Sequence, residues 1–157
     1  MPPDPLLLRR ATRADGEPVF ALITGILHEF GLQPDATGTD ADLKDIEAAY
    51  HAAGGDFVVL VDADARIVGC CGLFRSDTTV VELRKMYVAA TLRGQGQGRR
   101  LLDWALARAR ELGFRRMDLE TNSVLKTAIA QYVRRGFKPV DTGCHTCRCD
   151  AAYSREL

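Results

Sequence analysis

The sequence has no excess of charge of either sign, because 21 lysines and arginines balance 21 aspartates and glutamates. Net charge therefore gives no indication of a nucleic-acid or membrane-surface partner, and neither is expected. The sequence also lacks an apolar run long enough to span a membrane, and its first eight residues lack the charged start and apolar stretch of a signal peptide. The five cysteines are odd in number, which favours free thiols in a reducing compartment and hence a cytoplasmic protein.

The length of 157 residues is typical of one domain, and 46% hydrophobic residues suffice for a core, so we expect a single domain over residues 1–157. Hydrophobic spacing, with glycine and proline as breaks, predicts the secondary structure. The predicted elements are a strand at 6–10, helices at 16–30 and about 40–51, strands at 57–61, 67–74 and 80–88, a helix at 99–112, a strand at 116–121, a helix at 124–135, and strands at 137–140 and 144–151. This order predicts a mixed α/β domain around one sheet.

A glycine-rich segment, Arg93-Gly94-Gln95-Gly96-Gln97-Gly98, lies between the strand predicted at 80–88 and the helix predicted at 99–112. Glycines allow a ligand to approach the backbone closely. The first amides of a helix have no acceptor within it, and the helix dipole adds partial positive charge there. Arg99 and Arg100 oppose the dipole in an empty helix but favour a bound anion. The segment therefore predicts a site for a phosphate-bearing ligand.

Two common phosphate-binding motifs fit this segment poorly. A P-loop ends in Gly-Lys-Ser/Thr, whereas this loop ends Gly98-Arg99-Arg100. A dinucleotide-binding loop reads G-x-G-x-x-G, but its third glycine position holds Arg99, although Glu120 ends the next strand where a ribose-binding acid would stand. Since predicted antiparallel hairpins precede a single such unit, a dinucleotide-binding oxidoreductase is the third choice.

Three segments together resemble the GCN5-related N-acetyltransferases, the GNAT family. Arg93-x-x-Gly96-x-Gly98 resembles the family's acetyl-CoA loop, residues 82–88 resemble its central strand, and residues 128–137 resemble its A-x-x-x-Y-x-x-x-G-F segment. The resemblance implies an acyl-CoA N-acyltransferase fold, with a mixed, mostly antiparallel sheet that is flanked by helices and splayed at the central strand. One departure is Leu125, where many members have asparagine; Asn122 lies three positions earlier.

The resemblance also implies the reaction, which is direct transfer of an acetyl group from acetyl-CoA to an amine in a ternary complex, without a metal. The backbone of Met86, Tyr87 and Val88 would pair with the pantetheine, and one of these amides would polarise the thioester carbonyl. The cofactor's phosphates would lie against the glycine-rich loop. The residues that this implies are Arg93, Gly94, Gln95, Gly96, Gln97, Gly98 and Arg99.

Glu82 and Tyr132 are the candidate general base and general acid. Strand alternation puts Glu82, Arg84, Met86 and Val88 on one face and Leu83, Lys85 and Tyr87 on the other. Glu82 would deprotonate the amine, directly or through water; the alternative is a salt bridge to Arg84 or to a neighbouring strand. Tyr132 would share a proton with the coenzyme A thiolate; the alternative is an aromatic side chain that packs on a helix face.

The acceptor would be a small primary amine or an amine of a peptide or protein, against a wall formed by residues 16–55. Acidic residues gather between positions 29 and 47, which favours a polyamine or aminoglycoside-like cation unless they form a solvated face. A non-catalytic acyl-CoA-binding or sensing domain is the rival function. Since family members are often dimers, a homodimer is compatible with the resemblance. Cys144-His145-x-Cys147-x-Cys149 lacks a second ligand pair, so packing thiols are expected there rather than zinc, and Cys70-Cys71 is expected in the core.

Overall fold

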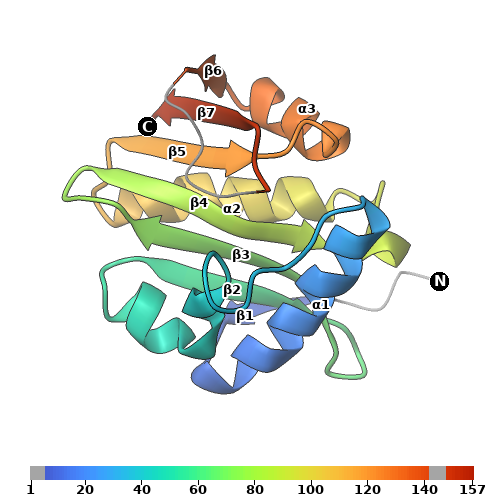
Figure 1. Cartoon of the computed structure of the whole chain (residues 1–157). Coiled ribbons are helices and arrows are strands. Elements are labelled where there is room, and N and C mark those ends of the chain that lie inside the picture. Colours follow the sequence, from blue (N-terminus) through green and yellow to red (C-terminus); the bar gives the residue numbers. More distant parts are fainter. Residues whose placement is uncertain (1–5, 142–147) are drawn as a thin grey trace.

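One twisted sheet of seven strands runs through the molecule in the order β1-β2-β3-β4-β5-β7-β6 (Figure 1). The computed structural model describes residues 6–141 and 148–157. The strands are β1 (Leu7–Arg10), β2 (Asp56–Val61), β3 (Ile67–Arg75), β4 (Val80–Val88), β5 (Arg116–Thr121), β6 (Lys138–Val140) and β7 (Ala151–Glu156). Neighbouring strands are antiparallel except for the parallel pair β4 and β5, which confirms the predicted mixed, mostly antiparallel sheet.

Helices cover both faces of the sheet and divide the core into two clusters. The helices are α1 (Gly16–Glu29), α2 (Gln97–Glu111) and α3 (Lys126–Arg134), with short turns η1 (Arg13–Asp15), η2 (Ala41–Lys44), η3 (Glu47–His51) and η4 (Ala90–Leu92). Figure 1 shows α1 in front of the sheet and α2 behind it. Val19 and Ile23 of α1 pack with Tyr50 and Phe57 in one cluster. Leu101 and Leu102 of α2 belong to the other.

The parallel pair β4 and β5 separates after a short stretch, which confirms the predicted splay at the central strand. The paired residues run from Val80 opposite Arg116 to Glu82 opposite Asp118. Beyond them, residues 83–88 of β4 and 119–121 of β5 line a cavity. A gap at the middle of the sheet, rather than at its edge, is therefore where a ligand can enter the fold.

A bulge in β4 makes the predicted alternation of faces wrong after Arg84. The register between β3 and β4 shifts between Cys70 and Gly72, and Lys85 has a φ of 56°. Because the bulge adds one residue, Lys85 points to the same side of the sheet as Arg84, towards α1. Met86 and Val88 then pack with the α2 cluster and Tyr87 with the α1 cluster, whereas alternation had placed Met86 beside Glu82.

Two predicted elements differ from the structure. The helix expected at about 40–51 is interrupted and forms two short helical segments, a 3-10 segment η2 and a π-helical segment η3. The break lies at Asp45, which is extended and whose carboxylate accepts a hydrogen bond from the Ala48 amide. Of the strand expected at 144–151, residues 144–147 lie outside the described residues. Residues 148–150 are not in a strand, because the Asp150 carboxylate accepts two hydrogen bonds from Ser123, and β7 begins only at Ala151. Within the described residues, no helix combines the length and apolar character that a membrane span requires.

Candidate active site

A cavity of about 1240 Å³ opens where β4 and β5 separate and where α2 begins. Its walls come from the end of α1, the 32–42 loop, β4, β5, α3 and the residues just before β7. All but one of the site residues expected from the sequence line it, the exception being Gln95. The residues that do so are Glu82, Met86, Tyr87, Val88, Arg93, Gly94, Gly96, Gln97, Gly98, Arg99 and Tyr132.

The N-terminus of α2 forms one end of the cavity. Gly96 is its N-cap residue with a φ of 79°, a conformation that suits glycine. The Arg100 amide donates to the Gly96 carbonyl at 3.0 Å and closes the first turn, so the amides of Gln97, Gly98 and Arg99 lack acceptors within the helix. The cations Arg99, Lys126 and Arg135 also line the cavity, and Arg135 pairs with Asp103 of α2 at 2.7 Å. Together these groups suit an anion with several oxygens.

Two residues of the predicted phosphate loop make contacts outside it. The Gln95 side chain donates to the Thr91 carbonyl at 3.2 Å. Arg93 forms an ion pair with Glu29 at the end of α1, and its guanidinium lies 5.2 Å from the centre of the Phe30 ring. Arg93 therefore ties the glycine-rich loop to α1, a contact across 64 positions that spacing alone does not predict.

The amides of Met86 and Val88 face the gap between β4 and β5. The Ala89 amide donates to the Val68 carbonyl of β3 at 2.8 Å, and Tyr87 lies opposite Cys70 of β3. Since successive residues of a strand direct their backbone groups to opposite edges, the groups of Met86 and Val88 point away from β3. They are therefore available to an extended ligand in the cavity.

Glu82 forms the salt bridge to Arg84 that the sequence left open, and it also lines the cavity. The Arg84 guanidinium reaches the two carboxylate oxygens at 3.0 and 3.1 Å, and its central carbon lies over the Phe74 ring, 3.7 Å from the ring centre. This arrangement fixes the carboxylate without covering it, because 22% of the Glu82 side chain remains exposed. A role as proton acceptor is thus compatible with the ion pair.

Tyr132 projects from α3 to the cavity and is only 6% exposed. Its ring meets Phe137 edge to face with 5.8 Å between centroids, so packing holds the phenol in place. Burial, followed by the neighbouring Tyr87 and Cys71, raises the pKa of Tyr132 well above its usual value. The side chain therefore remains a neutral phenol, able to donate a hydrogen bond, across the physiological pH range.

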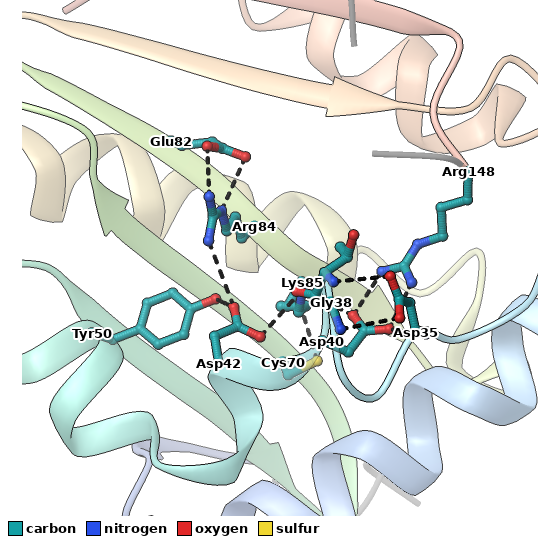
Figure 2. Close-up of polar contacts among 11 residues, drawn as sticks. Asp35, Gly38, Asp40, Asp42, Tyr50, Cys70, Glu82, Arg84, Lys85 and Arg148 are labelled. Carbon is teal, nitrogen blue, oxygen red and sulfur yellow. Dashed lines mark hydrogen bonds and ion pairs between the residues drawn. The ribbon is translucent and has the colours of Figure 1, made fainter. Parts of the chain in front are cut away.

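A buried ion network joins the 35–42 loop to β4 and to the chain before β7 (Figure 2). The Lys85 ammonium lies 3.0 Å from Asp40, and Arg148 donates to both oxygens of Asp40 at 2.6 and 2.8 Å. Burial alone would raise the pKa of Asp40, but hydrogen bonds from Arg148 and the Asp35 amide and the charge of Lys85 together hold it well below its usual range. The network spans segments far apart in the sequence.

The residues of this network escaped the sequence reasoning. The available signals were acidic residues in the 29–47 segment and two adjacent cations in a strand, but alternation put Lys85 on the wrong face. Asp42 also belongs to the network, since it accepts a hydrogen bond from the Tyr50 hydroxyl and lies 3.5 Å from Lys85 and 3.8 Å from Arg84. Asp40 and Asp42 are thus engaged with cations of the chain itself, which weakens the case for an acidic rim.

The other candidates from the sequence are less informative. Cys70 and Cys71 are fully buried, as expected for core residues. Three members of the Cys144-His145-x-Cys147-x-Cys149 segment lie outside the described residues. Within 6–141 and 148–157, no group of three or more His, Cys, Asp or Glu side chains is placed to hold a metal ion.

Comparison with known sequences points to a single family. The family model described as "Acetyltransferase (GNAT) family" matches residues 23–137. An Escherichia coli K12 protein, "Uncharacterized N-acetyltransferase YjgM", is 35% identical over 164 residues, which cover 99% of this chain and 97% of that protein. "Aminoalkylphosphonate N-acetyltransferase" of Salmonella typhimurium LT2 is 31% identical over 134 residues, with 83% and 84% of the two chains covered.

Solved structures agree in fold. A crystal structure of an acetyltransferase of the GNAT family from Staphylococcus aureus Mu50 has a TM-score of 0.91 at 26% identity and covers 98% of this chain and 99% of that one. A phosphinothricin acetyltransferase from Sinorhizobium meliloti, solved in complex with AcCoA, has a TM-score of 0.75 at 23% identity, with 97% and 88% covered. The likeness to the Sinorhizobium meliloti protein, at 23% identity, shows a shared fold.

Proposed function

Because the chain belongs to the acetyltransferase (GNAT) family and is an acyltransferase, we propose that it transfers an acetyl group from acetyl-CoA to an amine by direct attack in a ternary complex. The observation that carries this proposal is the cavity itself. It joins the amide-bearing N-terminus of α2, the outward amides of Met86 and Val88, and the side chains of Glu82 and Tyr132. A non-catalytic binding domain would need the first two features but has no use for the last two.

In the proposed reaction the coenzyme A pyrophosphate lies against the amides of Gln97, Gly98 and Arg99. The pantetheine extends through the gap along β4, where the amide of Met86 or Val88 polarises the thioester carbonyl. These groups bind and orient the thioester, so the acceptor amine meets its carbonyl carbon in a fixed geometry.

Two side chains act on the reacting groups: Glu82 on the proton of the acceptor and Tyr132 on the charge of the leaving thiolate. Glu82 takes a proton from the acceptor ammonium, directly or through water, so that the amine nitrogen can form the new C–N bond. As the C–S bond breaks, the electron pair goes to sulfur, and the Tyr132 phenol donates a hydrogen bond to the thiolate. The acceptor nitrogen gives up two protons in all, one to Glu82 before the attack and one as the amide forms. One of them ends on the sulfur of coenzyme A, and the other is released to solvent. The raised pKa of Tyr132 keeps its phenol protonated throughout.

We propose a small primary amine as acceptor. The loop of residues 35–42 lines the same cavity as Glu82, and its Asp40 and Asp42 carboxylates are bound to cations of the chain. These cations are Lys85, Arg84 and Arg148. A polycation therefore meets fewer open carboxylates than the sequence suggests. The Salmonella relative acts by name on aminoalkylphosphonates, so amines that carry an acidic group belong among the candidates beside polyamines and aminoglycosides. The buried free thiols of Cys70 and Cys71 support a cytoplasmic location.

The decisive experiment incubates the protein and acetyl-CoA with polyamines, aminoglycosides, amino acids, aminoalkylphosphonates and basic peptides, and measures thiol release. Release with one class supports the proposal and identifies the acceptor. If acetyl-CoA binds but no amine class gives thiol release, and if the Glu82→Gln and Tyr132→Phe variants bind acetyl-CoA as tightly as the wild type, the binding-domain alternative is favoured.

The proposed direct attack also predicts the kinetic pattern. Cys70 and Cys71 are buried, and burial raises the pKa of the Cys70 thiol to about 12 and that of Cys71 well above its usual value, so neither suits a covalent acyl intermediate. Initial rates measured against both substrates should give intersecting lines in double-reciprocal plots. Parallel lines, the signature of a covalent acyl-enzyme, would contradict the ternary complex.

A further inference from the structure

Lys85 combines an uncommon backbone conformation with a buried, ion-paired side chain. Its φ of 56° lies in the left-handed region, which residues other than glycine rarely adopt. The residue stands where the register between β3 and β4 shifts, so this φ is part of the bulge. Such a conformation persists only where the surrounding structure holds it.

Cys70 holds the bulge from the side of β3. Its thiol donates to the Lys85 carbonyl at 3.0 Å, and the backbone amide of Tyr87 bonds to the same sulfur. The sulfur thereby satisfies backbone groups that the bulge removes from the regular ladder. This contact fixes the backbone on one edge only.

The Lys85 side chain holds the bulge from the other direction (Figure 2). The ammonium donates to the Thr39 carbonyl at 2.9 Å and lies 3.0 Å from Asp40, and only 3% of the side chain is exposed. The Asp40 carboxylate is itself held in place, because Arg148 and the Asp35 amide also donate hydrogen bonds to it. The ammonium is therefore clamped to a fixed anchor.

The conformation of Lys85 decides which amides face the gap between β4 and β5. With regular alternation in place of the bulge, the backbone groups after Lys85 would move by one position relative to β3. The amide of Tyr87, rather than those of Met86 and Val88, would then face the gap.

We propose that Lys85 is a positioning residue, whose ammonium, clamped by Thr39 and Asp40, holds the left-handed bulge that presents the Met86 and Val88 amides to the pantetheine. The identification of pantetheine as the ligand of these amides rests on the proposed function. The role of the Lys85 side chain in holding the bulge is independent of it.

The test compares Lys85→Met with Lys85→Gly. Both variants remove the ammonium and leave Asp40 without it, so they share that cost. Glycine adopts a φ of 56° without strain, so Lys85→Gly should keep the bulge. Methionine is strained at this φ and lacks the ammonium that holds it, so Lys85→Met should destabilise the bulge. Lys44→Met, which removes an exposed lysine from η2, is the matched control.

Calorimetry measures the affinities for acetyl-CoA and for 3′-phosphoadenosine 5′-diphosphate, which lacks the pantetheine. We expect Lys85→Met to lose about tenfold in acetyl-CoA affinity, with about twofold change or less for the fragment, because the α2 end is untouched. Lys85→Gly and Lys44→Met should keep acetyl-CoA affinity within about threefold of the wild type. Without the bulge the Tyr87 amide would turn from β3 to the gap, so amide hydrogen exchange at Tyr87 should be faster in Lys85→Met than in Lys85→Gly.

Equal losses of acetyl-CoA affinity in the two variants, with equal exchange rates, would overturn the proposal. If the wild type does not bind acetyl-CoA, the proposed function fails, and the exchange rates alone decide the role of Lys85. If neither variant folds, Asp40→Asn weakens the tether without changing Lys85. Unchanged exchange at Tyr87 in that variant would also count against the proposal.

Discussion

Tyr132 presents a phenol to the cavity that is rigidly packed and remains neutral. Tyr132→Phe removes only the hydroxyl, so the ring contact with Phe137 should survive and the protein should fold. If the phenol hydrogen-bonds the departing thiolate, kcat should fall by about 10²-fold or more while the acetyl-CoA affinity stays the same. Thiol release by Tyr153→Phe, a variant in β7 away from the cavity lining, is the control. An unchanged kcat for Tyr132→Phe would assign the residue to packing alone.

Glu82 allows an equally narrow test, because glutamine preserves its size and can still accept a hydrogen bond from Arg84. Glutamine cannot take a proton from the acceptor, so kcat should fall by about 10²- to 10⁴-fold. The comparison is Glu111→Gln, which removes an exposed carboxylate from α2 that also pairs with an arginine. Both variants should bind acetyl-CoA as the wild type does. If Glu82→Gln keeps full activity, the carboxylate serves only its ion pair with Arg84.

At the scale of elements, the N-terminus of α2 depends on a left-handed glycine at its cap. Gly96→Ala would introduce a side chain at a φ of 79°, at a cost of about 1–2 kcal/mol, and would disturb the amides that follow. We expect the affinity for 3′-phosphoadenosine 5′-diphosphate to fall by about tenfold. Gly113→Ala imposes similar strain where α2 ends, with a φ of 90° and open space for the new methyl group. It should destabilise the protein to a similar extent but leave this affinity unchanged.

The elements also show where sequence reasoning succeeded and where it stopped. Glycine positions and apolar spacing are local signals, and they predicted the strand, loop and helix around Gly96. The bulge at Lys85 has no such signal, because its φ depends on contacts with Cys70, Thr39 and Asp40 from three other parts of the chain. Strand alternation therefore held up to Arg84 and failed beyond it.

At the scale of the whole molecule, ion pairs connect parts of the chain that no periodic pattern relates. Asp40 and Arg148 are 108 positions apart, yet their contact joins the loop after α1 to the chain before β7. Lys85 adds the central strand to the same network. The sequence contained the charges but not their partners, so an acidic rim for a cationic acceptor was a reasonable hypothesis from composition and has weaker support from the structure.

This network should make the stability of the protein dependent on pH. The pKa of Asp40 is lower in the folded protein than the value near 3.9 of an unfolded chain. The stabilisation by its charge is therefore fully present above pH 5 and is lost as the pH falls below about 3.9 towards the folded value. Asp40→Asn leaves Lys85 and Arg148 without their carboxylate, and we expect it to lower the free energy of unfolding at pH 7 by about 3–5 kcal/mol.

Denaturant unfolding at pH 7, 5 and 3 measures this difference directly. The difference in free energy of unfolding between wild type and Asp40→Asn should be the same at pH 7 and 5. It should narrow at pH 3, where Asp40 of the unfolded chain takes up a proton while Asp40 of the folded protein stays charged. Asp64→Asn, in the exposed turn between β2 and β3, controls for a general loss of negative charge. A gap that stays constant down to pH 3 would mean that the contribution of Asp40 does not depend on its ionisation. The joining of the loop after α1, β4 and the chain before β7 would then rest on packing rather than on charge.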